Sequence, residues 1–154
     1  MRELRRKDRA ITDDEAIAIL NKAEYGVLST ISPDGKPYGV PLSFCIIDNC
    51  IYFHCAIEGQ KIDNIEKNKS VSFCAVWDTE VLPDKFGTIY ESAIVSGEIE
   101  EIFDDDKQIA LEGLLKKYSS NYFEKGLEYI KTSKTKTRVF KIRILHVSGK
   151  ARRK

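Results

Sequence analysis

Tight-turn signals between short β-branched and aromatic segments are the feature that most limits how this chain can fold. The first turn is Pro33-Asp34-Gly35-Lys36, and the second is Asp48-Asn49, where both residues tolerate a positive φ. They separate three segments with strand character, residues 25–32, 38–47 and 50–56. Because such short turns join antiparallel neighbours, the sequence predicts an antiparallel meander over its first third.

Further along the chain, segments with strand and helix patterns alternate without an internal repeat or a low-complexity linker. Strands are expected at residues 70–77, 88–102 and 137–147, and Gly97 is expected to mark a bulge or bend. Residues 78–87 are expected to form a loop. Helices are expected from the Thr12–Glu15 capping box to about residue 24, and over residues 60–68, 104–118 and 121–131.

The number of strands and their connections indicate the fold class. Six strands joined mostly by hairpins, with helices inserted between them, predict a small antiparallel β-barrel with peripheral helices. A chain of 154 residues has the length of one such domain. Pro37 and Pro41 cannot donate hydrogen bonds to a neighbouring strand, so the second strand is expected to be irregular or free on one side.

Composition limits the compartment and the partners. Because 25 basic residues balance 24 acidic ones, no overall field favours nucleic acid or a membrane surface, and no apolar run is long enough to span a bilayer. The charged N-terminal residues contain no apolar signal core. The four cysteines are not spaced as zinc ligands, and they therefore indicate reduced thiols in the cytoplasm: Cys45, Cys50, Cys55 and Cys74.

The charges are distributed unevenly along the chain. Residues 91–112 carry eight acids and one base, whereas residues 131–154 carry ten bases and no acid. One interpretation is that the acidic and basic faces meet in the folded chain and that the end is a solubilising tail. Another is that the basic end, densest over residues 149–154, supplies an anion site. Contact with nucleic acid is disfavoured, because the basic end has no interleaved aromatic residues.

The strongest chemical signal lies between residues 53 and 65. A predicted strand ends there, Gly59 turns the chain, and a helix begins with Lys61 in its first turn. The first turn of a helix normally favours acids, so a lysine there indicates a bound anion such as phosphate, held by the ammonium and by free backbone N–H groups. The alternative is a lysine that is simply exposed and solvated.

The two histidines are candidates for contacts with the same ligand. His54 shares a strand face with Tyr52 and Ala56, and it is either structural or a hydrogen-bonding group near neutral pH. Cys55 points to the opposite face, so a nucleophilic Cys–His pair with His54 is not expected. His146, near the end of the last strand, either packs or contacts the ligand.

Several motifs, in order, carry a resemblance to a known family. They are Arg5-Arg6-Lys7-Asp8, residues 26–30, 34–38 and 40–44, residues 52–56 with Gly59-Gln60-Lys61, residues 90–97, and His146-Val147-Ser148-Gly149-Lys150. With these motifs the chain resembles the FMN-binding split-barrel proteins related to pyridoxamine 5′-phosphate oxidase, and within them the nitroimidazole-resistance group. The resemblance implies one domain over residues 1–154, a mainly β fold that is a six-stranded antiparallel split β-barrel with peripheral α-helices.

The resemblance also implies a homodimer with FMN bound in two clefts at the subunit interface. Gln60 and Lys61 would hold the phosphate, with Gln60 at a position where the family often has arginine. His54 and Cys55 would lie beside the flavin, with His54 as the candidate catalytic residue. Backbone groups of the second strand would meet the isoalloxazine edge, at Val40, Pro41, Leu42 and Ser43. The other subunit would contribute the remaining contacts, from Tyr90, Ser92, His146 and Lys150.

The activity that the resemblance implies is that of a cytoplasmic FMN-dependent oxidoreductase. It would take electrons from a donor such as NAD(P)H and reduce a small-molecule acceptor, an aromatic or nitro compound such as a 5-nitroimidazole. Three alternatives stay open, because a fold and a cofactor do not determine the reaction. They are a pyridoxamine-phosphate-oxidase-like oxidase, a non-enzymatic flavin-binding or sensing protein, and a split-barrel protein that binds haem or deazaflavin.

Overall fold

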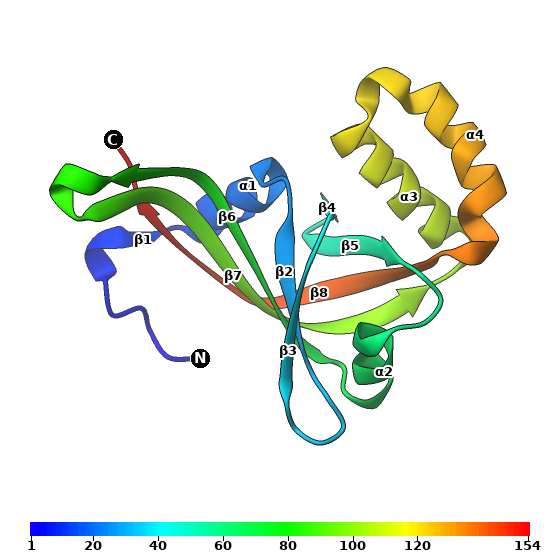
Figure 1. Ribbon diagram of the computed structural model, residues 1–154, viewed down its shortest axis with the longest axis horizontal. Coiled ribbons are helices and arrows are strands. Elements are labelled where there is room, and N and C mark those ends of the chain that lie inside the picture. The colour runs from blue at the N-terminus through cyan, green and yellow to red at the C-terminus, as the bar shows by residue number, and fades with distance from the viewer.

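The computed structural model describes residues 1–154 as one strongly twisted antiparallel sheet with helices packed against it (Figure 1). The strands are β1 (Ala10–Ile11), β2 (Gly26–Ile31), β3 (Pro37–Leu42), β4 (Cys45–Ile47), β5 (Cys50–Cys55), β6 (Ser70–Leu82), β7 (Gly87–Ile102) and β8 (Arg138–Arg152). The α-helices are α1 (Asp13–Lys22), α2 (Gln60–Lys67), α3 (Asp104–Tyr118) and α4 (Phe123–Ser133). None of the helices is both long and apolar enough to cross a lipid bilayer.

The path of the sheet closes it into a split barrel. The strand order is β3-β2-β6-β7-β8-β5-β4, with β1 paired to β8. In a flat sheet the edge strands β3 and β4 would lie roughly 29 Å apart. Only Ser43 and Phe44 connect them, a link that spans about 10 Å at most. The sheet therefore curls until its two edges meet without hydrogen bonds between them, which confirms the split barrel, although with eight strands rather than six.

Two apolar clusters cover β5 on both of its faces. Inside the barrel, 18 buried residues form one cluster, in which Phe53 of β5 stacks on its β8 partner Phe140 with ring centroids 5.6 Å apart. A second cluster of seven buried residues joins α3 and α4 to the outer face of the sheet, and it includes Leu111, Leu114 and Ile130. Side chains on the outer face of β5 therefore lie beneath the α3–α4 hairpin (Figure 1).

Several local predictions are confirmed. The Thr12–Glu15 capping box is present in both directions at the start of α1. Asp48 and Asn49 form the turn between β4 and β5 with φ of 49° and 58°. The pairing of β7 with β8 shifts register next to Gly97, where an added Cβ would lie 2.4 Å from the backbone oxygen of Arg143. These features depend on local chemistry, which explains why the sequence indicates them directly.

The strand expected over residues 38–47 is in fact two strands. It breaks because Phe44 is fully buried and its backbone is held by another element. The Phe44 N–H donates to the Tyr118 hydroxyl at 3.0 Å, and the Phe44 carbonyl oxygen lies 3.0 Å from the same hydroxyl. The β3 segment pairs only with β2, as Pro37 and Pro41 indicate.

The loop expected at residues 78–87 is largely strand. β6 continues past a bulge between Trp77 and Glu80, and β7 resumes at Gly87, so the two strands form a hairpin at one end of the molecule (Figure 1). The hairpin is closed by a 3-10 turn at residues 83–85 and by Phe86 with φ of 49°. Most side chains of this hairpin are exposed, so the sequence lacks the alternation of apolar and polar residues that identifies a strand.

The last strand continues to Arg152 instead of ending near residue 147. The basic end thus pairs with β7, and its charges meet acids: Arg153 lies 2.6 Å from Glu91 and 3.1 Å from Glu15, and Lys154 lies 2.6 Å from Glu80. These contacts support the interpretation in which the acidic and basic faces of the chain meet.

Candidate functional site

The junction between β5 and α2 has the form that the sequence predicts. β5 ends at Cys55, four residues follow in neither strand nor helix, and α2 begins at Gln60. Gly59 has φ of 147°, a conformation that favours glycine. Its carbonyl oxygen accepts hydrogen bonds from the amides of Ile62 and Asp63, both at 3.1 Å. The first amides of α2 have no carbonyl partner within the helix, as at every helix start.

Lys61 lies in the first turn of α2, where its charge has no counterion. The residue is partly buried and forms no ion pair with any carboxylate. Burial raises the pKa of the Cys55 thiol, and the positive charges of Lys61 and Arg138 oppose that rise. An unpaired ammonium therefore stands with free amides at the positive end of a helix. This arrangement fits an anionic group such as a phosphate.

A buried polar network fixes α2 against the barrel. The Asn64 side chain is fully buried, and its Nδ2 donates to Thr30 Oγ1 of β2 at 2.9 Å. Gln60 Nε2 donates to Asn64 Oδ1 at 2.7 Å, so the Gln60 amide is held by its own helix. Gln60 also borders a shallow hollow of about 350 Å³ beside the β2–β3 turn. The network sets where the first turn of α2 lies.

Replacing Asn64 with alanine is expected to destabilise the protein by about 1–3 kcal/mol, because the buried Thr30 hydroxyl loses its partner. Urea denaturation measures this change. The double variant Thr30→Val/Asn64→Leu removes both polar groups, and it is expected to lose less than the sum of the two single variants. Additive losses would mean that the two side chains do not depend on each other.

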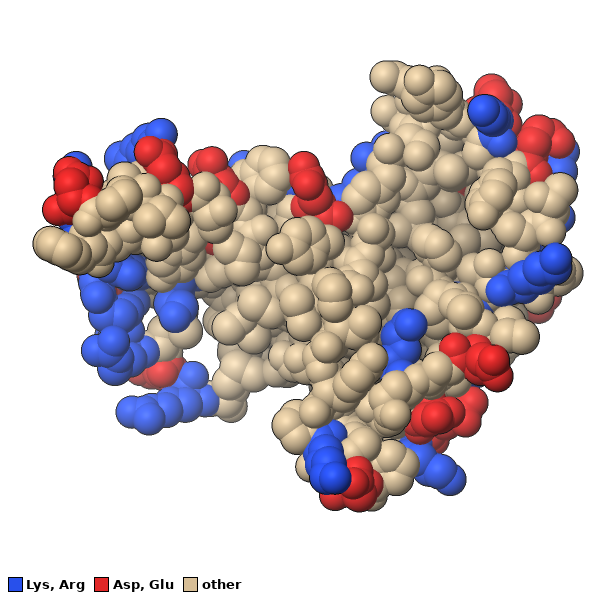
Figure 2. All heavy atoms as spheres, viewed as in Figure 1, with Lys and Arg blue, Asp and Glu red and all other residues tan.

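His54 faces a cavity roofed by the α3–α4 hairpin. The cavity has a volume of about 260 Å³, and Ser43 and His54 line it together with Tyr118 of α3 and Tyr129 of α4. Figure 2 shows the surface beside the α3–α4 hairpin hollowed and mostly uncharged, and Lys134 is the one charged residue that lines the cavity. Cys55 packs instead against the barrel cluster, on the other face of β5. The structure thus brings Ser43 and His54 together and separates His54 from Cys55.

The surroundings of His54 keep its imidazole neutral. Solvent reaches the ring through the cavity, yet desolvation by the enclosing protein lowers the pKa of His54 below its usual 6.5. A neutral imidazole carries one N–H donor and one free nitrogen acceptor. His54 can therefore both donate a hydrogen bond to a ligand and accept one from it at neutral pH.

The lowered pKa predicts how stability depends on pH. Below pH 6.5 the unfolded chain protonates His54 while the folded chain resists doing so, so acidification favours unfolding. The variant His54→Asn lacks this penalty. Thermal unfolding between pH 7.5 and pH 5 is expected to show a smaller loss of Tm in His54→Asn than in the parent protein. Parallel losses in the two proteins would contradict a desolvated His54.

The remaining predicted residues fall into two groups. Val40 and Leu42 pack against the barrel cluster, so β3 offers its unpaired backbone edge rather than these side chains. Ser92 and Lys150 are register partners on β7 and β8, far from β5. On β8, Lys150 is eleven residues beyond Val139, the partner of His54, which amounts to about 36 Å of strand. Tyr90 and His146 lie in the same half of β7 and β8 as this pair.

The fold agrees with a comparison to known protein families. A family model described as pyridoxamine 5′-phosphate oxidase matches residues 12–151. The chain belongs to the pyridoxamine 5′-phosphate oxidase family. No curated protein sequence matches the chain.

Several solved structures share this architecture, and some of these proteins bind a flavin or haem. A protein of Bacteroides thetaiotaomicron assigned to 5-nitroimidazole antibiotic resistance is 23% identical with a TM-score of 0.79, covering 92% of this chain and 85% of that one. An FAD-binding protein of Mesorhizobium loti is 25% identical with a TM-score of 0.64, covering 92% and 95%. An FAD- and haem-binding protein of Mycobacterium smegmatis is 15% identical with a TM-score of 0.76, covering 91% and 71%.

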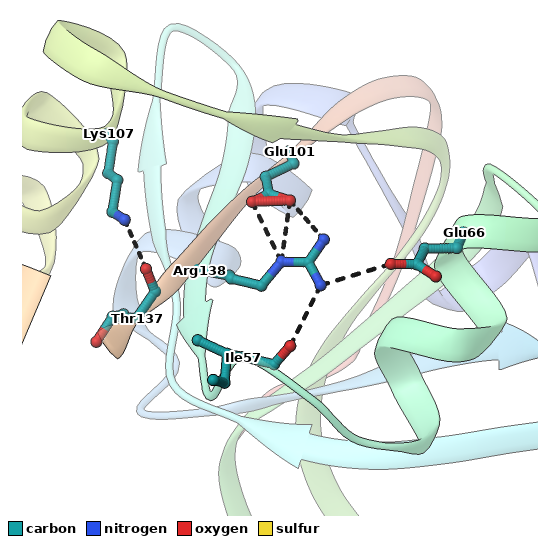
Figure 3. Close-up of polar contacts among 6 residues, drawn as sticks. All are labelled: Ile57, Glu66, Glu101, Lys107, Thr137 and Arg138. Carbon is teal, nitrogen blue, oxygen red and sulfur yellow. Dashed lines mark hydrogen bonds and ion pairs between the residues drawn. The ribbon is translucent and has the colours of Figure 1, made fainter. Parts of the chain in front are cut away.

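The sequence did not indicate one group of residues that lies beside the candidate site of this pyridoxamine 5′-phosphate oxidase family member. Arg138, Glu101 and Glu66 form a charged cluster next to the β5–α2 junction (Figure 3). The signal was present in the alternation of the last strand, because Arg138 falls on the same face as Phe140 and Ile142, which point into the barrel. A charge on an apolar strand face indicates a buried partner of opposite charge.

Proposed function

We propose that the protein binds FMN and reduces small aromatic or nitro compounds such as 5-nitroimidazoles. The observation that carries the proposal is the unpaired, partly buried Lys61 in the first turn of α2. Membership of the pyridoxamine 5′-phosphate oxidase family supports a phosphate-bearing cofactor at this position. The similarity to a protein assigned to 5-nitroimidazole resistance supports the choice of acceptor, and the similarity to an FAD-binding protein supports a flavin.

In this proposal, different residues of the chain bind different parts of FMN. Lys61 and the amides of residues 59–61 hold the phosphate, with Gln60 beside them. The unpaired edge of β3 offers backbone groups to the isoalloxazine ring. His54, neutral at physiological pH, offers a donor and an acceptor in the cavity next to Ser43. When bound, FMN supplies the redox chemistry, taking electrons from a donor such as NAD(P)H and passing them to the acceptor.

A second copy of the chain completes the site in this proposal. His54 and Lys61 belong to one half of the chain, and Tyr90, Ser92 and Lys150 to the other, too far along β8 to reach the same ligand. A homodimer with FMN at the interface brings the two halves together. The outer face of β6, β7 and β8 suits such an interface because its central part carries small or uncharged side chains, with Lys150 beside Ser92 as the nearest charge. These side chains are Ser72, Cys74, Val76, Ser92, Ile94, Ser96, His146 and Ser148.

The dimer is tested by dilution. If two subunits build each cleft, dissociation to monomers releases the cofactor. We expect the fluorescence of free flavin to appear at the same protein concentration at which sedimentation detects monomers. A stable monomer that keeps its flavin would contradict the shared cleft. We also place the protein in the cytoplasm, where its four unpaired cysteines stay reduced.

The activity is tested by anaerobic turnover. NAD(P)H is expected to bleach the flavin of the purified holoprotein, and a 5-nitroimidazole added afterwards is expected to restore its colour with consumption of the nitro compound. Failure of every pyridine nucleotide and acceptor to change the spectrum would contradict the reductase and favour a flavin-binding or sensing role. Turnover of pyridoxamine 5′-phosphate with oxygen would favour the oxidase.

A further inference from the structure

A partly buried arginine, Arg138, lies next to the β5–α2 junction and is bonded to a glutamate (Figure 3). Arg138 is the first residue of β8 and pairs across the sheet with Cys55. Its Nε donates to Glu101 at 2.9 Å, and its Nη2 donates to the same carboxylate at 2.6 Å. The two side chains are only 24% and 20% exposed. A two-point arginine–carboxylate pair with this burial holds the guanidinium plane in one orientation.

The remaining guanidinium nitrogen connects this pair to the junction. Nη1 of Arg138 donates to the carbonyl oxygen of Ile57 at 3.3 Å and lies 3.5 Å from Glu66 of α2. One side chain thus links β7, β8, the residues after β5 and helix α2. The backbone of Arg138 is held as well, because Lys107 Nζ of α3 donates to the carbonyl oxygen of Thr137 at 2.5 Å (Figure 3).

Residues 56–59 have few other restraints. They belong to no strand or helix, and the Ile57 side chain is 60% exposed. Arg138 is the one side chain that hydrogen-bonds their backbone. An added Cβ at Gly59 would meet nothing within 4 Å, so packing does not hold that residue. The Gly59 carbonyl oxygen is bonded by the amides of Ile62 and Asp63, so it is residues 56–58 whose position depends on the bond from Arg138 to Ile57.

That bond also orients the next amide. No peptide bond in the chain is cis, and in a trans peptide the N–H points opposite to the C=O of the same unit. With the Ile57 oxygen directed to Arg138, the Glu58 N–H is directed away from the guanidinium. The guanidinium itself already has Glu101, Glu66 and the Ile57 oxygen as partners, so it acts on a ligand through the segment rather than by contact.

We propose that Arg138 is a positioning residue that holds residues 56–58 in the conformation that binds the flavin phosphate, and that it thereby sets the preference for FMN over riboflavin. The inference rests on the proposed function, since it requires the phosphate to lie at the start of α2.

The test compares two flavins that differ only by the phosphate. FMN and riboflavin are each titrated into the flavin-free protein, and their Kd values are measured by fluorescence quenching for the parent, Arg138→Met and Arg143→Met. Arg143 is the matched control, because it lies on the same strand and pairs with Glu98 at 2.8 Å but is 60% exposed and away from the junction. We expect Arg138→Met to raise the Kd of FMN roughly tenfold or more and to leave that of riboflavin within about twofold. Arg143→Met is expected to change neither value.

The variant Arg138→Lys provides a second test if Arg138→Met folds poorly. It keeps the positive charge beside Glu101 but cannot reach the Ile57 oxygen and both carboxylates at once, so it is expected to weaken FMN alone. Equal weakening of both flavins by the Arg138 variants, or no effect on FMN, would overturn the role of Arg138 while leaving the phosphate site standing. Equal affinity of the parent protein for FMN and riboflavin would overturn the phosphate site itself, and the role of Arg138 with it.

Discussion

Replacing Lys61 with alanine is expected to weaken FMN binding by about 1.5–3 kcal/mol, or roughly 10- to 150-fold in Kd. The reason is that Lys61 is the one cation at the start of α2 without a carboxylate partner, so its ammonium is free to form a charge-assisted hydrogen bond with a phosphate. Titration of FMN into flavin-free protein, followed by fluorescence quenching, measures the change.

Lys67→Ala is the matched control for this prediction. Lys67 is the last residue of the same helix, and its side chain is exposed. Removing it changes the net charge by the same amount, so any general electrostatic attraction of FMN is equally reduced. We expect Lys67→Ala to bind FMN nearly as well as the parent. If Lys61→Ala retains FMN as firmly as Lys67→Ala does, the phosphate does not contact Lys61.

The largest expected effect on stability comes from Phe53→Ala. The Phe53 ring is fully buried, and it stacks on Phe140 where β5 pairs with β8. Truncation leaves a cavity in the barrel cluster, so we expect a loss of about 3–5 kcal/mol in the free energy of unfolding. Because His54 follows directly on the same strand, the variant is also expected to bind flavin less firmly.

Phe86→Ala is the matched control, because it makes the same chemical change at a side chain that packs against little of the protein. The Phe86 side chain is 96% exposed at the tip of the β6–β7 hairpin. We expect a change within about 0.5 kcal/mol. Urea denaturation of both variants measures the difference. A Phe53→Ala variant about as stable as Phe86→Ala would mean that β5 is not fixed by the barrel cluster, and the placement of the site would be wrong.

The sequence predicted well what local chemistry determines. The turn at Asp48-Asn49 follows from residues that tolerate a positive φ, and the start of α1 from the Thr12 capping box. The start of α2 was likewise visible, because Gly59 marks the turn and Ile62 and Ile65 face inward at helical spacing.

Features that depend on distant partners were not predicted. The break after Leu42 requires the Tyr118 hydroxyl, 74 residues away from Phe44, to take over the backbone hydrogen bonds of Phe44. The cavity beside His54 exists because α3 and α4 fold over β5, and no pattern near His54 indicates which element will cover it. Local pattern analysis carries no information about such long-range contacts.

The candidate site also contains both kinds of residue, those that local sequence identifies and those that depend on distant partners. Lys61 could be identified from its unfavourable place in a helix, whereas Arg138 is informative only once β8 is known to pair with β5 and β7. Whether Ser92, His146 and Lys150 join Lys61 depends on a second copy of the chain, which the order of residues in one chain does not describe.

The central claim is that the protein holds FMN, and the most direct measurement is the visible spectrum of the purified protein together with the mass of what it releases on denaturation. The account predicts flavin absorbance, and a released compound with the mass of FMN at one per chain. Release of haem, deazaflavin, FAD or riboflavin, or protein that stays colourless after incubation with FMN, would contradict it.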